Sequence, residues 1–189
     1  MKFNSQFGED KFLVEELGMP EKGFFLDFGA GDPIRLSNTY YFEQIGWDGI
    51  CIEADPRNFE ALLEKRKNVV FGVINDYAGL TDFNISGHGP DLSSIRYGED
   101  AQKIITACFT IRDLFNNVVI PEKVDLVSVD IEGSELLVID ELFKYRTPDV
   151  FIVEYDDDAF GKSEVSRYFE YKPYKLVLKN QANLIYKHE

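Results

Sequence analysis

Two short apolar runs near the start of the chain, each ending in a polar cluster, constrain the fold most. The first, residues 24–28, leads into a loop with Gly29 and Gly31, and the second, residues 50–52, ends at Glu53. Two such runs separated by a helix-length segment are typical of a βαβ unit in a parallel sheet. Glycine lets a ligand approach the backbone, and a carboxylate that ends the second strand can accept hydrogen bonds from ribose hydroxyls. A structural turn beside a solvated acid explains the glycines but not the spacing of Glu53, so we expect a Rossmann-like domain that binds a nucleotide-bearing molecule.

The composition limits the class of protein. The chain has 189 residues, 44% hydrophobic and 29% charged, so we expect one globular domain over residues 1–189. The net charge of −14 disfavours nucleic acid and anionic membranes as partners, because both need a cationic face. We find no apolar stretch of 18 residues and expect neither a membrane span nor a signal peptide.

The two cysteines indicate the compartment. Cys51 and Cys108 form no CxxC pair, which suits free buried thiols in a reducing compartment, so we expect a cytoplasmic protein. The sequence leaves the oligomeric state open.

A third apolar run, residues 69–74, is predicted to be the next strand of the same sheet. It is followed by Asn75 and Asp76, which a doubly wound sheet would place at the same carboxyl edge as Gly29 and Glu53. One of the two could accept a hydrogen bond from an adenine amino group. A polar loop start explains both residues equally well.

Short sequence patterns predict where two helices begin and how the chain ends. Asp55 before a proline is a predicted N-cap, and Thr110 with Asp113 resembles a capping box. Residues 174–178 and 184–186 read as a closing antiparallel hairpin.

Carboxylates crowd the junction after a fourth apolar run, residues 124–129. Asp130, Glu132 and Glu135 lie there, and Glu135 is explained as a first-turn acid of the next helix. Asp130 and Glu132 have no such structural explanation and are candidate catalytic residues. A fifth run, residues 150–153, ends at Glu154, and we interpret the acids at residues 156–158 that follow as solvated surface.

The most loop-like stretch is residues 86–98, which contains three glycines and a proline. Long loops of this kind are often functional, so we interpret it as a lid over the site, with a passive surface loop as the alternative. In the lid interpretation Ser93, Ser94 and Arg96 would bind a polar or anionic substrate.

Five blocks of residues, in order over residues 5–155, together resemble the FkbM family of S-adenosylmethionine-dependent methyltransferases. The resemblance implies an α/β, Rossmann-like class I methyltransferase fold, with a mostly parallel seven-stranded sheet, helices on both faces and an antiparallel strand near the end. It also implies methyl transfer to an oxygen, often a sugar hydroxyl of a glycan or a hydroxyl of a small metabolite. The blocks are Ser5-Gln6-x-Gly8-Glu9-Asp10, Phe25-x-Asp27-x-Gly29-Ala30, Ser37-Asn38-Thr39, Gly46-Trp47-x-Gly49-x-Cys51-Ile52-Glu53-Ala54-x-Pro56 and Val129-Asp130-x-Glu132-Gly133-x-Glu135.

The same resemblance implies roles for individual residues. Asp130 and Glu132 would lie beside the transferred methyl group, where they could position the acceptor hydroxyl, take its proton or hold a divalent cation, although the sequence requires no metal. Carried over by position, the methionine part of S-adenosylmethionine is assigned to Asp27, Gly29 and Ala30, its carboxylate to Ser37, Asn38 and Thr39, the ribose to Glu53 and the adenine to Asp76. Gly31, where the family often has a larger residue, restores a Gly-x-Gly spacing and is a further cofactor-binding candidate.

One departure from the family pattern leaves alternatives open. Pro33 stands where the family usually has glycine, so the chain could instead be a cofactor-binding domain of the same fold without turnover. A nicotinamide-dependent oxidoreductase would share the first strand and Glu53, but it normally needs a third glycine in the loop, which this chain lacks.

Overall fold

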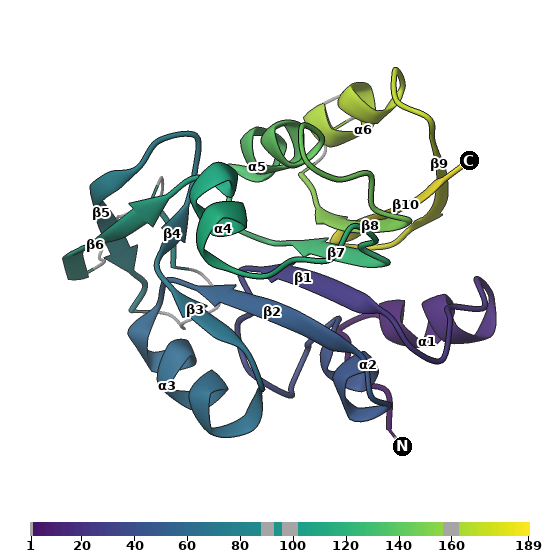
Figure 1. Ribbon diagram of the computed structural model, residues 1–189, viewed down its shortest axis with the longest axis horizontal. Helices are drawn as coiled ribbons and strands as arrows, with labels where there is room; N and C mark the ends of the chain where they lie inside the picture. Colours follow the sequence, from purple (N-terminus) through teal and green to yellow (C-terminus); the bar gives the residue numbers. More distant parts are fainter. Residues whose placement is uncertain (1, 88–92, 96–101, 157–162) are drawn as a thin grey trace.

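A seven-stranded sheet forms the centre of the protein (Figure 1) in the computed structural model, which describes residues 2–87, 93–95, 102–156 and 163–189. The strand order is β3-β2-β1-β7-β8-β10-β9, and every strand is parallel to the rest except β10, which runs antiparallel to both its neighbours. This arrangement confirms the predicted fold class, including the closing hairpin. The strands are β1 (Phe24–Phe28), β2 (Asp48–Glu53), β3 (Val69–Phe71), β7 (Leu126–Val129), β8 (Val150–Glu154), β9 (Tyr174–Lys179) and β10 (Asn183–His188).

Helices cover both faces of the sheet, as expected (Figure 1). Successive side chains of a strand point to opposite faces. Phe25 of β1 therefore joins the core beneath α1, α2 and α3, whereas Leu26 joins the core beneath α4, α5 and α6. None of the helices within the described ranges is long and apolar enough to cross a bilayer. The helices are α1 (Glu9–Glu15), α2 (Tyr40–Gln44), α3 (Pro56–Lys65), α4 (Ile111–Asn117), α5 (Glu135–Leu142) and α6 (Glu164–Phe169).

Several local sequence signals are confirmed. Asp55 caps α3 by accepting a hydrogen bond from the Arg57 N–H, and Thr110 and Asp113 form the predicted capping box of α4. Cys51 and Cys108 are buried free thiols. The two helix caps depend on the geometry of a few neighbouring residues, so a sequence pattern predicts them well.

The prediction of one continuous strand over residues 69–74 is wrong. The backbone turns at Gly72, which has a φ of 137°, and the chain leaves the main sheet after β3. A Cβ at Gly72 would lie 2.9 Å from the Ala107 carbonyl oxygen, so glycine is also required by space. Asn75 consequently follows a strand of a second sheet, where its N–H donates to the Phe109 carbonyl. That sheet has the order β4-β6-β5 and consists of β4 (Val73–Ile74), β5 (Gly79–Ile85) and β6 (Gln102–Phe109), the last of which the sequence did not predict.

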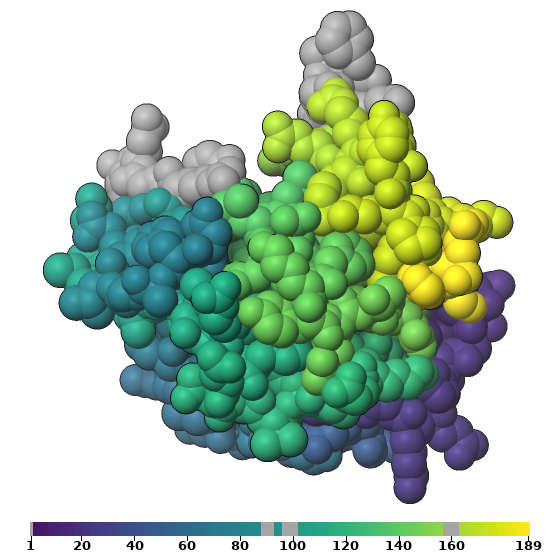
Figure 2. Space-filling model, turned by 45° about the horizontal axis from the view of Figure 1, so that its top comes forward, coloured from purple at the N-terminus to yellow at the C-terminus, as the bar shows by residue number. Residues whose placement is uncertain are grey.

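The second sheet lies beyond the carboxyl end of β2. Val73 and Phe83 are buried there and pack with Ala54 and Ile95. In the space-filling view the teal part of the chain, which contains β5 and β6, lies on the opposite side of the molecule from the yellow C-terminal part (Figure 2). The small sheet thus adds an apolar wall to the edge at which the parallel strands end.

Candidate active site

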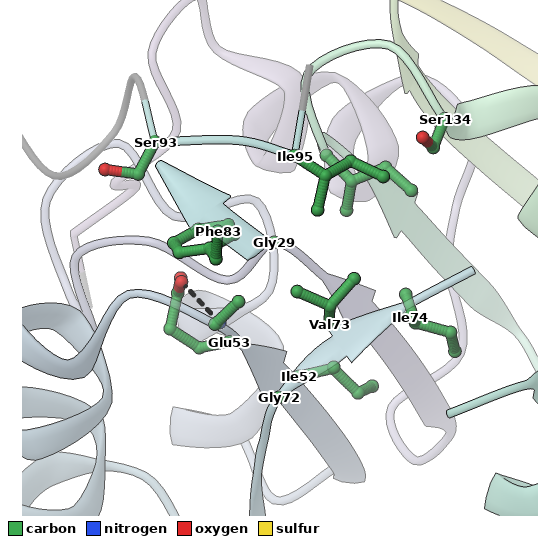
Figure 3. Close-up of a pocket in the computed structure, with 12 residues that line it drawn as sticks. Gly29, Ile52, Glu53, Gly72, Val73, Ile74, Phe83, Ser93, Ile95 and Ser134 are labelled. Carbon is green, nitrogen blue, oxygen red and sulfur yellow. Dashed lines mark hydrogen bonds between the residues drawn. The ribbon is translucent and has the colours of Figure 1, made fainter. Parts of the chain in front are cut away.

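Two adjoining pockets lie at the carboxyl ends of the parallel strands. The larger, which we call the polar pocket, has a volume of about 390 Å³ and is lined by the loop after β1 and by the ends of β2, β7 and β8. The smaller, which we call the apolar slot, lies between β2 and the second sheet (Figure 3). Gly29, Glu53 and Ser93 line both pockets, so one extended ligand could occupy the two together. The apolar walls of the slot are Ile52, Val73, Ile74, Phe83, Ile95 and Ile131.

The loop after β1 is shaped by close backbone packing. The N–H groups of Gly29 and Ala30 both donate to the Ile52 carbonyl, which ties the loop to β2. Gly29 has a φ of 76°, and a Cβ there would lie 1.7 Å from the Asp130 carbonyl oxygen. Only glycine fits, because the Asp130 backbone fills the place of a side chain. The backbone of Gly29 lines both pockets.

Glu53 connects the two pockets and organises the loop. One oxygen of its carboxylate accepts from the Gly31 N–H at 2.8 Å, and the other accepts from the N–H groups of Ala54 and Asp55 at 2.7 Å. Burial raises the pKa of the Glu53 carboxyl to about 7, although these three hydrogen bonds oppose the shift. A carboxylate has about four lone-pair positions, so three N–H donors leave capacity for a ligand hydroxyl.

A buried cation, Arg66, fixes the floor of the polar pocket. Its guanidinium donates to Glu43 at 2.9 Å, to Ser37 at 3.3 Å and to Thr39 at 2.7 Å. The Thr39 hydroxyl in turn donates to Asp27 at 2.5 Å. Burial raises the pKa of Asp27 even though Arg66 lies nearby and opposes the shift. The sequence did not identify this network, whose charges are all removed from water.

Three carboxyl groups converge where β7 and β8 end. Asp130 follows β7, Glu132 lies two residues later and Glu154 ends β8, and one oxygen from each lies within 4.8 Å of the others. Loss of hydration, together with the charge of Glu154, raises the pKa of Glu132 to about 7 and holds the pKa of Asp130 above its usual range, although Asp130 is an exposed residue and Glu132 and Glu154 are half-buried. A carboxyl with a pKa near 7, such as that of Glu132, can accept a proton at neutral pH. The same oxygens are the donor type that Mg²⁺ or Ca²⁺ prefers.

Backbone strain coincides with the polar pocket. Within the described ranges, the non-glycine residues with positive φ are Leu36, at 65°, and Glu132, at 58°, and both line this pocket. The left-handed conformation costs an L-residue about 1–2 kcal/mol. Such strain is often retained where a side chain must be presented to a ligand.

We expect Glu132→Gly to raise the free energy of unfolding by about 0.5–1 kcal/mol, because glycine adopts the left-handed conformation without a Cβ penalty but gains entropy in the unfolded chain. Urea unfolding would measure the change. Glu132→Gln removes the charge and keeps the strained backbone, so it serves as the matched control. A Glu132→Gly protein less stable than Glu132→Gln would contradict the assignment of strain.

Unpaired buried polar atoms also gather at this site. In the part of the chain that the structure describes, four buried side-chain polar atoms have no hydrogen-bond partner. Asn38 Oδ1 and Asn58 Nδ2 belong to residues that line the polar pocket, and Ser134 Oγ belongs to a residue that lines the apolar slot. The fourth, Thr106 Oγ1, belongs to a residue outside both linings. Since a buried polar group without a partner costs free energy, the three atoms at the pockets are candidate partners for a polar ligand.

The structure brings most of the predicted site residues together. The polar pocket is lined by Asp27, Gly29, Ala30, Gly31, Ser37, Asn38, Glu53, Ser93, Asp130 and Glu132. Its lining combines backbone from the glycine loop with carboxylates from three strand ends, as the sequence indicated.

Other predicted site residues lie elsewhere. Thr39 is fully buried beneath the pocket in the Arg66 network, and it lines neither pocket. Asn75 and Asp76 also lie outside both linings, because the chain changes sheets at Gly72. The expectation that they share the edge of Gly29 and Glu53 is therefore wrong.

The predicted substrate loop is described only in part. The Ser93 hydroxyl accepts from the Ser86 N–H and donates to Asp55 at 2.8 Å, so it is already engaged at the rim of the pockets. Ser94 is buried and exchanges backbone hydrogen bonds with Asn84. Arg96 lies outside the described residues.

Sequence reasoning missed several residues of the site. Glu154 ends a buried strand beside β7, the same pattern that identified Glu53, but the sequence analysis gave it no role. Asn58 and Ser134 have no distinguishing sequence signal, since both lie in the first turn or cap of a helix. Only the fold shows that their side chains line pockets.

The sheet order, the antiparallel strand β10 and the pockets at the strand ends define a Rossmann-like α/β domain. The family profile described as "Methyltransferase FkbM domain" matches residues 27–176, so the chain belongs to the FkbM methyltransferase family. Membership in this family supports an enzyme that transfers a methyl group. No curated protein matches the chain significantly.

Among solved structures, the crystal structure of TehB from Haemophilus influenzae is similar in fold. The two share 10% sequence identity with a TM-score of 0.52, over 97% of this chain and 63% of that chain. The chain thus spans less than two thirds of the TehB chain. At this identity the likeness concerns the fold alone.

Proposed function

We propose that this protein transfers the methyl group of S-adenosylmethionine to an oxygen of a small polar acceptor, such as a hydroxyl of a sugar or metabolite. The observation that carries the proposal is the pair of joined pockets, one apolar and one acidic, whose linings contain three buried polar atoms without partners. The family match supports methyl transfer, and the site supports the choice of donor and acceptor.

The residues present fit an S-adenosyl donor. An aromatic base suits the apolar slot between Ile52 and Phe83. Glu53, at the junction of the pockets, has capacity for a ribose hydroxyl. The amino-acid part would be held beside the open backbone at Gly29 and by the amide of Asn38.

The charges of the polar pocket favour this donor over a dinucleotide. Six carboxyl residues line the pocket against one cationic residue, Arg35. A sulfonium and an ammonium group are attracted by such a lining, whereas the pyrophosphate of a nicotinamide cofactor is repelled. The acidic lining therefore disfavours the alternative of a nicotinamide-dependent oxidoreductase.

The acidic trio supplies the means to activate an oxygen acceptor. S-adenosylmethionine, when bound, supplies an electrophilic methyl group. Asp130 and Glu132 would orient the acceptor hydroxyl, and a carboxylate of the trio would accept its proton as the oxygen becomes a nucleophile. A pKa near 7 at Glu132 suits a general base at neutral pH. Alignment of the acceptor and exclusion of water account for the rest of the contribution of the protein.

We expect Glu53→Ala to weaken the binding of S-adenosylhomocysteine by roughly tenfold or more, because hydrogen bonds to a charged group contribute about 1.5–3 kcal/mol. Titration calorimetry would measure the affinity. Glu60→Ala, which removes an exposed acid of α3, is the control and should bind normally. Full affinity in a folded Glu53→Ala protein would remove the ribose assignment.

Transfer itself needs a separate assay. Incubation with labelled S-adenosylmethionine and an extract divided into glycans, small metabolites and proteins should label the glycan or small-metabolite fraction. Binding of S-adenosylhomocysteine without label in any fraction would instead support a domain without turnover.

A further inference from the structure

The apolar slot presents a problem for any base that enters it. A purine carries hydrogen-bonding atoms around its edge, whereas the walls of the slot are formed by aliphatic and aromatic side chains such as Val73, Phe83 and Ile95. Burial of a polar edge against such walls is unfavourable unless a partner is provided. The slot must therefore contain a polar side chain if it is to prefer one base.

Two hydroxyl side chains line the slot, one at each end (Figure 3). The Ser93 hydroxyl is already engaged, because it donates to Asp55 and accepts from the Ser86 N–H. Ser134 differs: its residue is 3% exposed, and its Oγ has no hydrogen-bond partner. The free hydroxyl of the slot therefore belongs to Ser134.

The local structure of α5 leaves this hydroxyl without a partner. Ser134 is the N-cap residue, a position where serine normally accepts a hydrogen bond from an N–H of the first turn, but its side chain makes no capping bond. Its backbone carbonyl, not its hydroxyl, accepts from the N–H groups of Leu137, at 3.2 Å, and Val138, at 3.3 Å. The Ser134 side chain is therefore buried against the slot without a hydrogen-bonding role in the free protein.

We propose that the Ser134 hydroxyl is the hydrogen-bond partner of the purine edge and so sets the base preference of the donor site. This role rests on the proposed function, and it replaces the sequence-based assignment of the adenine to Asn75 or Asp76, which line neither pocket. A hydroxyl both donates and accepts, so it can pair with a ring nitrogen or with the exocyclic amino group.

Calorimetry with S-adenosylhomocysteine tests the proposal first. Ser134→Ala should bind about five- to tenfold more weakly, the size expected for one neutral hydrogen bond. Its melting temperature should be unchanged or higher, because the hydroxyl that is removed was unpaired. Thr106→Val is the matched control, since Thr106 also has a buried, unpaired hydroxyl but lies outside both linings, and it should bind normally.

Base analogues then distinguish a direct contact from a packing effect. The probes are S-nucleosylhomocysteines that lack one polar atom each: the 1-deaza, 3-deaza and 7-deaza analogues and the purine analogue without the amino group. One of them should bind the wild type more weakly than S-adenosylhomocysteine does, yet lose little further affinity in Ser134→Ala, because the same hydrogen bond is already absent.

The experiments distinguish failure of the Ser134 role from failure of the proposed function. Normal binding of S-adenosylhomocysteine to the wild type, with additive losses for all four analogues, would overturn the role of Ser134 and leave the proposed function standing. Failure of the wild type to bind S-adenosylhomocysteine at all would overturn the proposed function and this inference together.

Discussion

Arg66→Met is expected to lower the free energy of unfolding by about 3–5 kcal/mol, the usual cost of removing one partner from a buried ionic network. The Arg66 guanidinium is 5% exposed and pairs with Glu43 at 2.9 Å. It also contacts Ser37 and Thr39, and the latter holds Asp27. Without the cation, two buried acids would lose their compensation, and the loop that forms the polar pocket would lose its anchor.

Urea unfolding followed by the fluorescence of Trp47, which is the one tryptophan of the chain and is fully buried, would measure this loss. Lys65→Met is the control, because it removes a neighbouring but exposed positive charge. Arg66→Lys should recover only part of the stability, since an ammonium cannot reproduce the planar set of donors. A loss below about 1 kcal/mol in Arg66→Met would show that the network contributes little to stability.

The second large effect is expected at the acidic trio. Asp130→Asn and Glu132→Gln should each lower turnover by about a hundredfold or more, the usual size of a general-base contribution, and leave the affinity for S-adenosylhomocysteine within a few fold. The reason is that both residues would contact the acceptor oxygen rather than the nucleoside. Steady-state kinetics and calorimetry on the same preparations would separate the two quantities.

Two controls sharpen this test. Asp76→Asn removes an exposed acid outside both pockets and should change neither quantity. Assays with EDTA and with added Mg²⁺ or Mn²⁺ distinguish a general base from a cation site, since metal dependence would assign the trio to holding a cation. Normal turnover in both acid variants would remove Asp130 and Glu132 from the reaction.

The parts of the site that could be predicted from sequence depend on short-range geometry. A strand that ends in glycines, a strand that ends in Glu53 and a buried strand that ends in Asp130 are each encoded within a few residues. The parallel sheet then brings these ends together without further information. The loop after β1 and four acids of the polar pocket, Asp27, Glu53, Asp130 and Glu132, were therefore predictable.

The remaining features depend on long-range packing. The sequence around Gly72 does not predict that the chain leaves the main sheet there, so Asn75 and Asp76 were expected at the edge of Gly29 and Glu53, where they do not lie. Arg66 lies just after a helix, and its partners come from a segment 23 to 29 positions away in sequence. The role proposed for Ser134 depends on the absence of a capping bond and on its burial against the slot, neither of which the sequence shows.

A crystal structure with S-adenosylhomocysteine should show one S-adenosyl ligand bound across the two joined pockets. We expect the base in the apolar slot beside Ser134, the ribose at Glu53 and the amino-acid part in the polar pocket. The sulfur would then face Asp130. Electron density for the ligand at any other place, or an empty slot beside a ligand bound only in the polar pocket, would contradict this expectation.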